Sequence, residues 1–173
     1  MRRVNVRTLS ASDVETLLPS LVDVLRDVVD NGGSLGFLAP LDDADARSYW
    51  RSLVPEIERG SRFLFAAFVG ARLVGSVQLL LSPWVNSPHR AEVQKLFVAT
   101  SLKGQGIGKV LMAAVHDLAR ERGRSLLLLN TRLGNPAEHF YHAHGYRVAG
   151  VIPGYAFGSD GERYDSLAMY RQS

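Results

Sequence analysis

The stretch KLFVATSLKGQGIGKVLM, residues 95–112, constrains the fold more than any other part of this sequence. An apolar run typical of a strand leads into a glycine cluster (Gly104, Gly106 and Gly108) and then into a helical apolar pattern. Ordering glycines costs conformational entropy, so such a cluster indicates a backbone that side chains would obstruct. Free amides at the start of a helix, together with the helix dipole, predict an anion site.

Two well-known phosphate-binding loops do not fit the spacing of these glycines. A P-loop requires G-x-x-x-x-G-K-[ST], but Lys103 occupies the position of its first glycine. The dinucleotide pattern G-x-G-x-x-G fails because counting from Gly104 reaches Lys109, and counting from Gly106 reaches Leu111. Neither a P-loop nor a dinucleotide-binding loop is therefore predicted.

Length and composition narrow the class of protein. The 173 residues suit a single domain over residues 1–173, and 46% hydrophobic with 21% charged residues is an ordinary globular balance. A net charge of +3 suits an anionic small ligand and is too small to indicate nucleic-acid binding. The absence of cysteine excludes disulfides, thiolate metal ligands and a cysteine nucleophile. No signal peptide or membrane span is predicted, so we expect a cytoplasmic protein with no membrane partner.

In the N-terminal part, RRVNVRTL alternates like a strand, and Ser10 with Asp13 has capping-box spacing. The helix that starts there is expected to run to about Asn31, with a possible kink at Pro19. A second helix is expected from Asp42 or Asp43 to Gly60. The runs RFLFAAFV and RLVGSVQLLL, separated by a Gly-Ala turn, predict an antiparallel hairpin, and HRAEVQKLFV predicts the next strand.

The C-terminal part begins with the helix over residues 106–123 and continues with SLLLLN, a run expected of a strand buried on both faces. Residues 135–145 predict a short helix with Asn135 as N-cap, and YRVAGVIP and SLAMYR predict closing strands. The resulting order, β-α-α-β-β-β-α-β-α-β-β, predicts an α/β fold with a mixed sheet and helices on both faces. The apolar stripe of the 106–123 helix is predicted to comprise Val110, Leu111, Ala114, Val115 and Leu118.

The glycine loop fits the [RQ]-x-x-G-x-[GA] pyrophosphate loop of the GNAT (GCN5-related) N-acetyltransferase superfamily, with Lys103 where Arg or Gln is usual. Residues 89–155 resemble that family, and within it their sequence is most similar to the tabtoxin-resistance-type and streptothricin-type small-molecule acetyltransferases. The resemblance implies a mostly antiparallel sheet of about seven strands. It also implies that strands 4 and 5 splay apart and that four helices cover both faces.

The resemblance implies acetyl-CoA as co-substrate. Backbone groups of a strand would hold the pantetheine arm and the thioester carbonyl, and the loop amides would hold the pyrophosphate. Asn135 would bond the pantetheine, although it could equally serve as a simple helix cap. The implied cofactor-binding residues are Leu96, Phe97, Val98, Lys103, Gly104, Gln105, Gly106, Ile107, Gly108, Lys109, Asn130 and Asn135.

Direct attack of an amine on a thioester needs a proton acceptor for the amine and a donor for the sulfur. Glu92 is the candidate base, and alternation places it on the same strand face as Gln94 and Leu96; the alternatives are a strand-edge charge or a water chain as base. Tyr141 matches the family's general acid, or else is a packed aromatic. Asn130 stands where tabtoxin-resistance-like sequences tend to carry an acid, so it would position a water or the cofactor. The candidate acceptor-binding residues are Phe37, Trp84, His89 and Glu92.

These residues predict an N-acetyltransferase for a primary amine of a small molecule, possibly an antibiotic or toxin. The alternatives are a protein N-alpha or lysine acetyltransferase, which would need an open groove, and a non-catalytic acyl-CoA sensor. A nucleotide-binding protein is a more distant alternative. The three histidines His139, His142 and His144 lack carboxylate or cysteine partners, so no metal is predicted. A monomer and a homodimer remain equally open.

Overall fold

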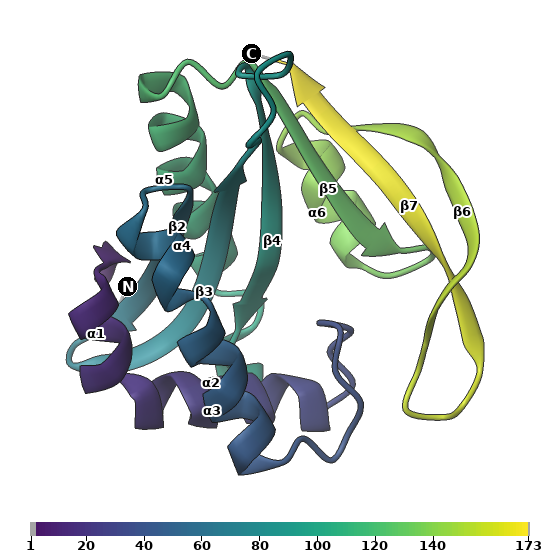
Figure 1. Ribbon diagram of the computed structural model, residues 1–173. Coiled ribbons are helices and arrows are strands. Elements are labelled where there is room, and N and C mark those ends of the chain that lie inside the picture. Colours follow the sequence, from purple (N-terminus) through teal and green to yellow (C-terminus); the bar gives the residue numbers. More distant parts are fainter. Residues whose placement is uncertain (1–2, 173) are drawn as a thin grey trace.

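The computed structural model describes residues 3–172, which build one seven-stranded sheet with helices on both sides (Figure 1). The strand order is β1-β2-β3-β4-β5-β7-β6, in which β4 and β5 run parallel and all other neighbours run antiparallel. The predicted mixed, mostly antiparallel sheet is therefore confirmed. The strands are β1 (Val4–Leu9), β2 (Arg62–Val69), β3 (Arg72–Leu81), β4 (Arg90–Val98), β5 (Leu126–Arg132), β6 (Arg147–Phe157) and β7 (Arg163–Gln172).

The helices are shorter and more numerous than the four predicted. The capping box of Ser10 and Asp13 starts α1 as expected, but the chain leaves the helix at Leu17, before Pro19. A second interruption lies at Leu53, before Pro55. Proline has no N–H to donate, so each one starts a new helix instead of continuing the old one. The helices are α1 (Ala11–Thr16), α2 (Leu18–Asp30), α3 (Asp43–Ser52), α4 (Val54–Glu58), η1 (Thr100–Leu102), α5 (Ile107–Glu121) and α6 (Ala137–Ala143).

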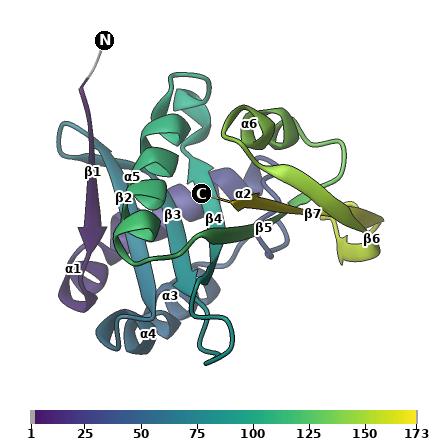
Figure 2. The same ribbon diagram turned by 90° about the horizontal axis from the view of Figure 1, so that it is seen from above.

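The two faces of the sheet carry separate hydrophobic cores. Figure 2 shows α5 and α6 on one side of the sheet and α3 and α4 on the other. We call the side that carries α5 and α6 the α5 face. We call the opposite side, where α2 and α3 contribute to the core, the α2 face. The core of the α2 face includes Trp50 and Leu64, and that of the α5 face includes Leu111 and Tyr146. The two faces therefore offer two separate approaches to the middle of the sheet.

Two expectations about burial on these faces are wrong. Val110 is exposed, and the buried stripe of α5 includes Ile107 and Met112 together with the predicted Leu111 and Val115, because this face of the helix packs against the sheet. In β5, Leu127 and Leu129 are buried on the α5 face, whereas Leu126 and Leu128 are half-buried. The α2 face of β5 is not covered by a helix, so this part of the sheet stays open.

The sheet splits between β4 and β5, as predicted. The two strands pair over only three positions, and the last pair is Glu92 with Leu128. Beyond this pair β4 stays bonded to β3 as far as Val98, while β5 stays bonded to β7 as far as Arg132. Figure 1 shows β5, β7 and β6 turning away from β4. We call the wedge-shaped region beyond the pair of Glu92 and Leu128 the split.

A β-bulge lies in β4 at the split. Gln78 pairs with Gln94 and Ser76 with Phe97, so β4 holds one residue more than β3 over this interval. Lys95 has φ 51° and is the one non-glycine residue with positive φ in the described chain. The bulge reverses the alternation of β4, since Phe97 joins the core of the α2 face and Leu96 that of the α5 face. The expectation that Leu96 shares a face with Glu92 is therefore wrong.

Candidate active site

The glycine loop leaves a row of backbone amides without acceptors. The first helical bond of α5 runs from the amide of Val110 to the carbonyl of Gly106, at 3.3 Å. Within residues 3–172, no backbone hydrogen bond uses the amides from Gly104 to Lys109. The first turn of α5 also carries no acidic residue that could occupy this position. The arrangement is thus an anion site built from main-chain donors and the helix dipole.

The loop glycines are needed for their backbone conformation. Gly104 has φ 78° and Gly106 has φ 80°, values that other residues rarely adopt. A Cβ atom at either position would meet no protein atom within 4 Å, so the space above the loop is open. Ile107, between them and the helix, is buried and fixes the loop to the α5 core. The predicted loop residues therefore leave open space for a ligand beside their backbone amides.

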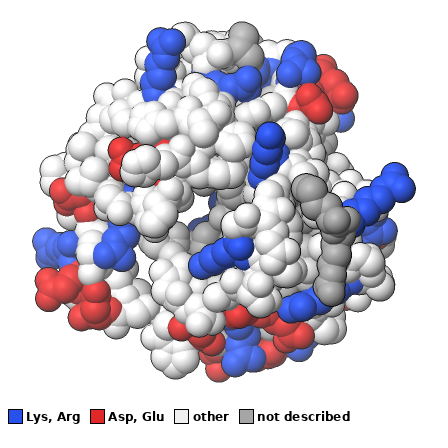
Figure 3. Space-filling view, turned by 180° about the vertical axis from the view of Figure 1, so that it is seen from behind, with Lys and Arg blue, Asp and Glu red and all other residues white. Residues whose placement is uncertain are grey.

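The α5 face is hollowed beside this loop. Figure 3 shows that face with a central hollow, next to which several Lys and Arg side chains gather. The basic run of Arg120, Arg122 and Arg124 lies at the far end of the 15-residue α5, about 22 Å from the loop. Arg120 pairs there with Asp117 at 3.1 Å. The run is therefore a helix end and does not contribute to the loop site.

The strand segment Leu96–Val98 presents an unpaired backbone edge towards β5, since the pairing between the two strands ends at Glu92. Its other edge is held close to β3. A Cβ on Gly75 would lie 2.7 Å from the carbonyl oxygen of Phe97, so only glycine permits this approach. The segment is thus held in place by β3 on one side. Its other side keeps backbone groups free to hydrogen-bond an extended ligand.

Tyr141 projects from α6 into the α5 core. Its side chain is 8% exposed, and its ring contacts those of Phe140 and Tyr146 at centroid distances of 5.5 and 5.8 Å. Burial raises the pKa of Tyr141 to about 12, so the hydroxyl keeps its proton at neutral pH. Among the described residues, no hydrogen bond involves this hydroxyl, and it is not one of their fully buried unpaired groups. The hydroxyl therefore reaches solvent, where it is accessible to a ligand.

The two asparagines differ in their surroundings. The side chain of Asn135 accepts a hydrogen bond from the amide of Ala137 at 2.9 Å, just before α6, whose N-cap residue is Pro136 and not the predicted Asn135. Its amide group keeps two donors free for a ligand. Asn130 is exposed on β5 at the split, on the same strand face as Leu128. Neither asparagine has a carboxylate partner, so both remain available to position a ligand.

Glu92 lies at the apex of the split, and its side chain is half-buried. It lines a cavity of about 320 Å³ together with Leu80, Trp84 and Leu128. No salt bridge joins it to Arg90 within residues 3–172, although Arg90 lines the same cavity. The structure thus brings two of the predicted acceptor-binding residues, Glu92 and Trp84, into one cavity beside the split.

The other two predicted acceptor-binding residues lie elsewhere. His89 is exposed and does not line the cavity of Glu92. Phe37 lies in the loop of residues 31–42, where its ring packs edge-on against Tyr49 at 5.0 Å. Lys95 connects this loop to β4, because its ammonium donates a hydrogen bond to the carbonyl oxygen of Leu35. Phe37 therefore belongs to the region around the bulge.

The 31–42 loop also contacts the other limb of the split. The amide of Ala39 donates a hydrogen bond to the hydroxyl of Ser159, at the tip of the β6–β7 hairpin, at 2.8 Å. Because Lys95 holds the loop to β4, the loop bridges the two diverging limbs on the α2 face. The base of the loop is fixed by the carboxylate of Asp30, which accepts from the amide of Leu41 at 2.8 Å. The α2 face of the split is therefore bridged by this loop, although no helix covers β5 on that face.

A buried polar network lies beside the bulge, and sequence reasoning missed it. Arg62 is 8% exposed and donates to Gln78 at 2.5 Å and to Gln94 at 2.9 Å. Its Nε donates to Glu56, and Gln78 donates to the hydroxyl of Tyr49 at 2.7 Å. The sequence did contain one indication of this network, because Gln78 and Gln94 occupy positions in strands that are otherwise mainly apolar. The network holds β4 and the neighbouring Lys95 in place.

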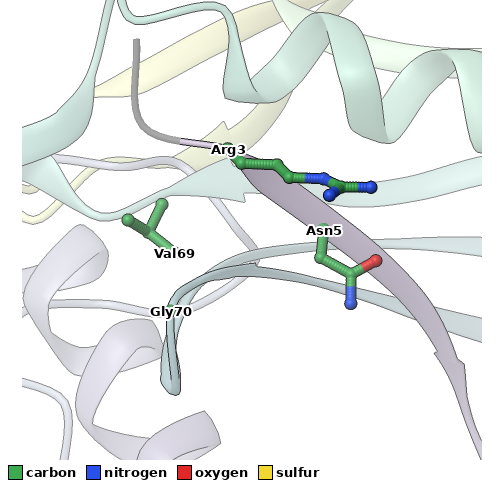
Figure 4. Close-up of a pocket in the computed structure, with 4 residues that line it drawn as sticks. All are labelled: Arg3, Asn5, Val69 and Gly70. Carbon is green, nitrogen blue, oxygen red and sulfur yellow. The ribbon is translucent and has the colours of Figure 1, made fainter.

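Other parts of the described chain do not form a competing site. No group of three metal-binding side chains comes together within residues 3–172, and His144 bonds the carbonyl oxygen of Phe140 instead. No helix among these residues is long and apolar enough to cross a membrane. A second hollow, of about 680 Å³, lies at the opposite edge of the sheet (Figure 4) and carries no partner for catalysis. Its lining residues are Arg3, Asn5, Val69 and Gly70.

Comparison with known proteins identifies the family to which this chain, with its amide-lined anion loop beside a split sheet, belongs. The acetyltransferase (GNAT) family profile matches residues 34–146. Streptothricin acetyltransferase from Streptomyces lavendulae is 30% identical over 152 residues, which cover 87% of this chain and 70% of that protein. The chain belongs to the acetyltransferase (GNAT) family.

Solved structures share the fold across the whole chain. A ribosomal-protein-alanine N-acetyltransferase from Brucella melitensis superposes with a TM-score of 0.76 at 22% identity, covering 98% of this chain and 99% of that one. An N-acetyltransferase from Staphylococcus aureus Mu50 gives a TM-score of 0.79 at 14% identity, covering 98% of both chains. At such identities the likeness concerns the fold alone, which is the predicted one.

Proposed function

We propose that this protein transfers an acetyl group from acetyl-CoA to a primary amine of a small molecule. The observation that carries the proposal is the split, because one limb presents a free strand edge and the amide-lined loop lies directly beyond it. The loop residues fit a pyrophosphate, and Leu96–Val98 fit the amide-bearing pantetheine arm. Asn135 would hold the same arm with its free amide donors.

The chemistry requires two proton transfers around one acyl transfer. Acetyl-CoA, when bound, supplies the acetyl group as a thioester. Glu92 accepts a proton from the ammonium group of the acceptor, directly or through a water held by Asn130. Tyr141 relays the second proton from the nitrogen to the sulfur: its hydroxyl proton goes to the sulfur as the carbon–sulfur bond breaks and the carbon–nitrogen bond forms, and the remaining excess proton of the nitrogen restores the hydroxyl. No covalent enzyme intermediate is needed, in agreement with the absence of cysteine.

The acceptor proposed is a small molecule because the 31–42 loop bridges the α2 face of the split. Its contacts with Lys95 on β4 and Ser159 on the β6–β7 hairpin leave a covered space rather than an open groove. An open groove is what a protein lysine or a chain terminus would need. The relative from Streptomyces lavendulae is named for streptothricin, which favours an antibiotic or toxin amine as the first acceptors to try.

The test is release of free thiol from acetyl-CoA by the purified protein with a panel of amines. The panel contains streptothricins, aminoglycosides, polyamines, amino acids and a peptide with a free N-terminus. Release with one small-molecule class would support the proposal and identify the acceptor type. Release with the peptide alone would favour a protein acceptor, and acetyl-CoA binding without any turnover would favour a sensor. Failure to bind acetyl-CoA would overturn the proposal.

A further inference from the structure

The split carries a charge pattern on its α2 face that is repeated on both limbs. On β4, the order from the apex outward is a carboxylate, an amide and a cation. On β5, which has the apolar Leu128 opposite that carboxylate, an amide and a cation follow two and four residues further along, whereas on β4 they follow two and three residues beyond the carboxylate. The residues are Glu92, Gln94 and Lys95 on β4, and Asn130 and Arg132 on β5. The closed end of the wedge therefore carries the carboxylate of Glu92 beside the cation of Arg90, whereas the open end carries two cations and no carboxylate of these strands.

Lys95 faces the α2 side because of the bulge. Its ammonium lies 5.4 Å from the ring centre of Phe37 and 5.9 Å from that of Tyr49, and it donates to the carbonyl oxygen of Leu35. No carboxylate lies within 4 Å of it among residues 3–172. Burial lowers the pKa of Lys95, as does the charge of Arg62, and Glu92 partly offsets both. This cation therefore lacks a counterion of its own.

Arg132 is the corresponding cation on the other limb. It shares a face of β5 with Leu128 and Asn130, and its guanidinium carbon lies 3.0 Å from the ring centre of Tyr164 on β7. The nearby Asp160 does not pair with Arg132, since its carboxylate accepts from the Tyr164 hydroxyl and from the amide of Glu162. The ring fixes the guanidinium, which also bonds the Tyr164 side chain. The hydrogen bond from Tyr164 is the main cause that lowers the pKa of Asp160, and the charge of Arg132 helps to lower it without forming a salt bridge within 4 Å. The fork of N–H groups on this guanidinium suits recognition of a planar anion.

We propose that the acceptor carries an anionic group, a carboxylate or a related acid, several bonds away from the amine that is acetylated. The amine would lie towards Glu92 and the acid towards Arg132 and Lys95. Arg132 lies four residues beyond Leu128, the strand partner of Glu92, so the Cα atoms of Leu128 and Arg132 are about 13 Å apart. This inference rests on the proposed function and narrows its acceptor to a zwitterionic, amino-acid-like molecule.

The test compares acceptors that differ only in the remote group: 6-aminohexanoate, its neutral amide and 1,6-diaminohexane. We expect kcat/KM to be about 10- to 100-fold higher for the acid than for the amide, as for one charge-assisted contact, and lowest for the diamine. In Arg132→Gln the ratio of acid to amide should fall close to one. Shorter and longer amino acids of the same series would then locate the preferred spacing.

The matched control is Arg163→Gln. Arg163 is also an arginine placed over an aromatic ring, Phe157 at 5.3 Å, but alternation puts it on the opposite face of β7 from Tyr164. The Arg163→Gln variant removes the same charge, and its ratio of kcat/KM for the acid to kcat/KM for the amide should equal that of the wild type. Equal kcat/KM for acid and amide in the wild type, or the same loss in both variants, would overturn the inference.

Failure of the proposed function would look different. If no amine is turned over, the acetyltransferase proposal fails, and binding then decides the charge inference. Calorimetry with 6-aminohexanoate in the presence of CoA should show binding to the wild type that Arg132→Gln weakens. Absence of binding, or equal binding to both proteins, would overturn the charge inference as well.

Discussion

The two faces of the split differ in which part of the chain forms them. On the α5 face, the groups aimed at a ligand are consecutive backbone amides from Gly104 to Lys109 and one tyrosine hydroxyl. On the α2 face they are side chains, brought together from the 31–42 loop, β4, β5 and the β6–β7 hairpin. The first face is local in sequence, whereas the second exists only in the folded chain.

This difference indicates which kind of ligand each face is suited to bind. Backbone amides read a diphosphate in the same way whatever side chains surround them, so such a face suits a cofactor shared by a whole family. Side chains on loops and strand ends can change without disturbing the sheet, so the opposite face suits an acceptor that varies. The predictions below test this division, beginning with the largest expected effect.

Tyr141→Phe should lower kcat by about 10²- to 10⁴-fold, because it removes the proposed proton donor. Affinity for acetyl-CoA, measured by calorimetry, should stay close to the wild-type value. The exposed Tyr155 provides the control, since Tyr155→Phe removes a hydroxyl far from the core of the α5 face. Unchanged turnover in Tyr141→Phe would assign this tyrosine to packing and would revive the sensor alternative.

Glu92→Gln should lower kcat/KM by about 10²-fold at neutral pH. The deficit should shrink at alkaline pH, where the acceptor amine loses its proton to bulk solvent and no longer needs a base. The pH–rate profile of both proteins checks this, with the exposed Glu58→Gln as charge control. A deficit that is constant across pH would mean that Glu92 positions the acceptor and does not accept its proton.

The same division explains what the sequence could predict. The loop follows from the spacing of glycines close together in the chain, whereas the split and the proposed role of Tyr141 are implied by the resemblance of residues 89–155 to the family. The bulge at Lys95 could not be predicted, because it depends on pairing with Gln78 of another strand and not on any glycine or proline signal. The error about Leu96 came from applying strict alternation across that bulge.

The acceptor side was predicted in part. Trp84 and Glu92 are close in sequence and do line one cavity, but His89 is turned away from it. Arg132 gave no signal of its own, because its importance depends on the ring of Tyr164 on a neighbouring strand. Residues that act through tertiary neighbours need the fold before they can be recognised.

Gly106→Ala tests the backbone character of the cofactor side. The added Cβ costs about 1–2 kcal/mol in a left-handed conformation and also reaches into the space proposed for the pyrophosphate. Gly161→Ala is matched, since Gly161 has φ 82° and equally open surroundings in the β6–β7 turn. Both variants should lose similar stability, but only Gly106→Ala should weaken acetyl-CoA binding, by about 10-fold or more. Equal affinities would place the pyrophosphate elsewhere.

The smallest effect concerns acid stability on the α5 face. His116 of α5 lies 3.2 Å from the hydroxyl of Tyr146, and its pKa is lowered to about 4, first by burial and then by the charges of Arg171 and His144. The folded protein thus keeps this imidazole neutral down to about pH 4, whereas the unfolded chain protonates it near pH 6.5. Between these values the unfolded state binds more protons, so stability falls as the pH falls.

Replacing this imidazole by a group that does not titrate should remove that dependence. Between pH 6.5 and pH 4.5, the thermal unfolding midpoint should fall less in His116→Gln than in the wild type, because the amide keeps a partner for Tyr146 without binding a proton. The exposed His139→Gln should behave as the wild type. Equal slopes in all three proteins would show that acid does not act on the contact between α5 and the Tyr146 region.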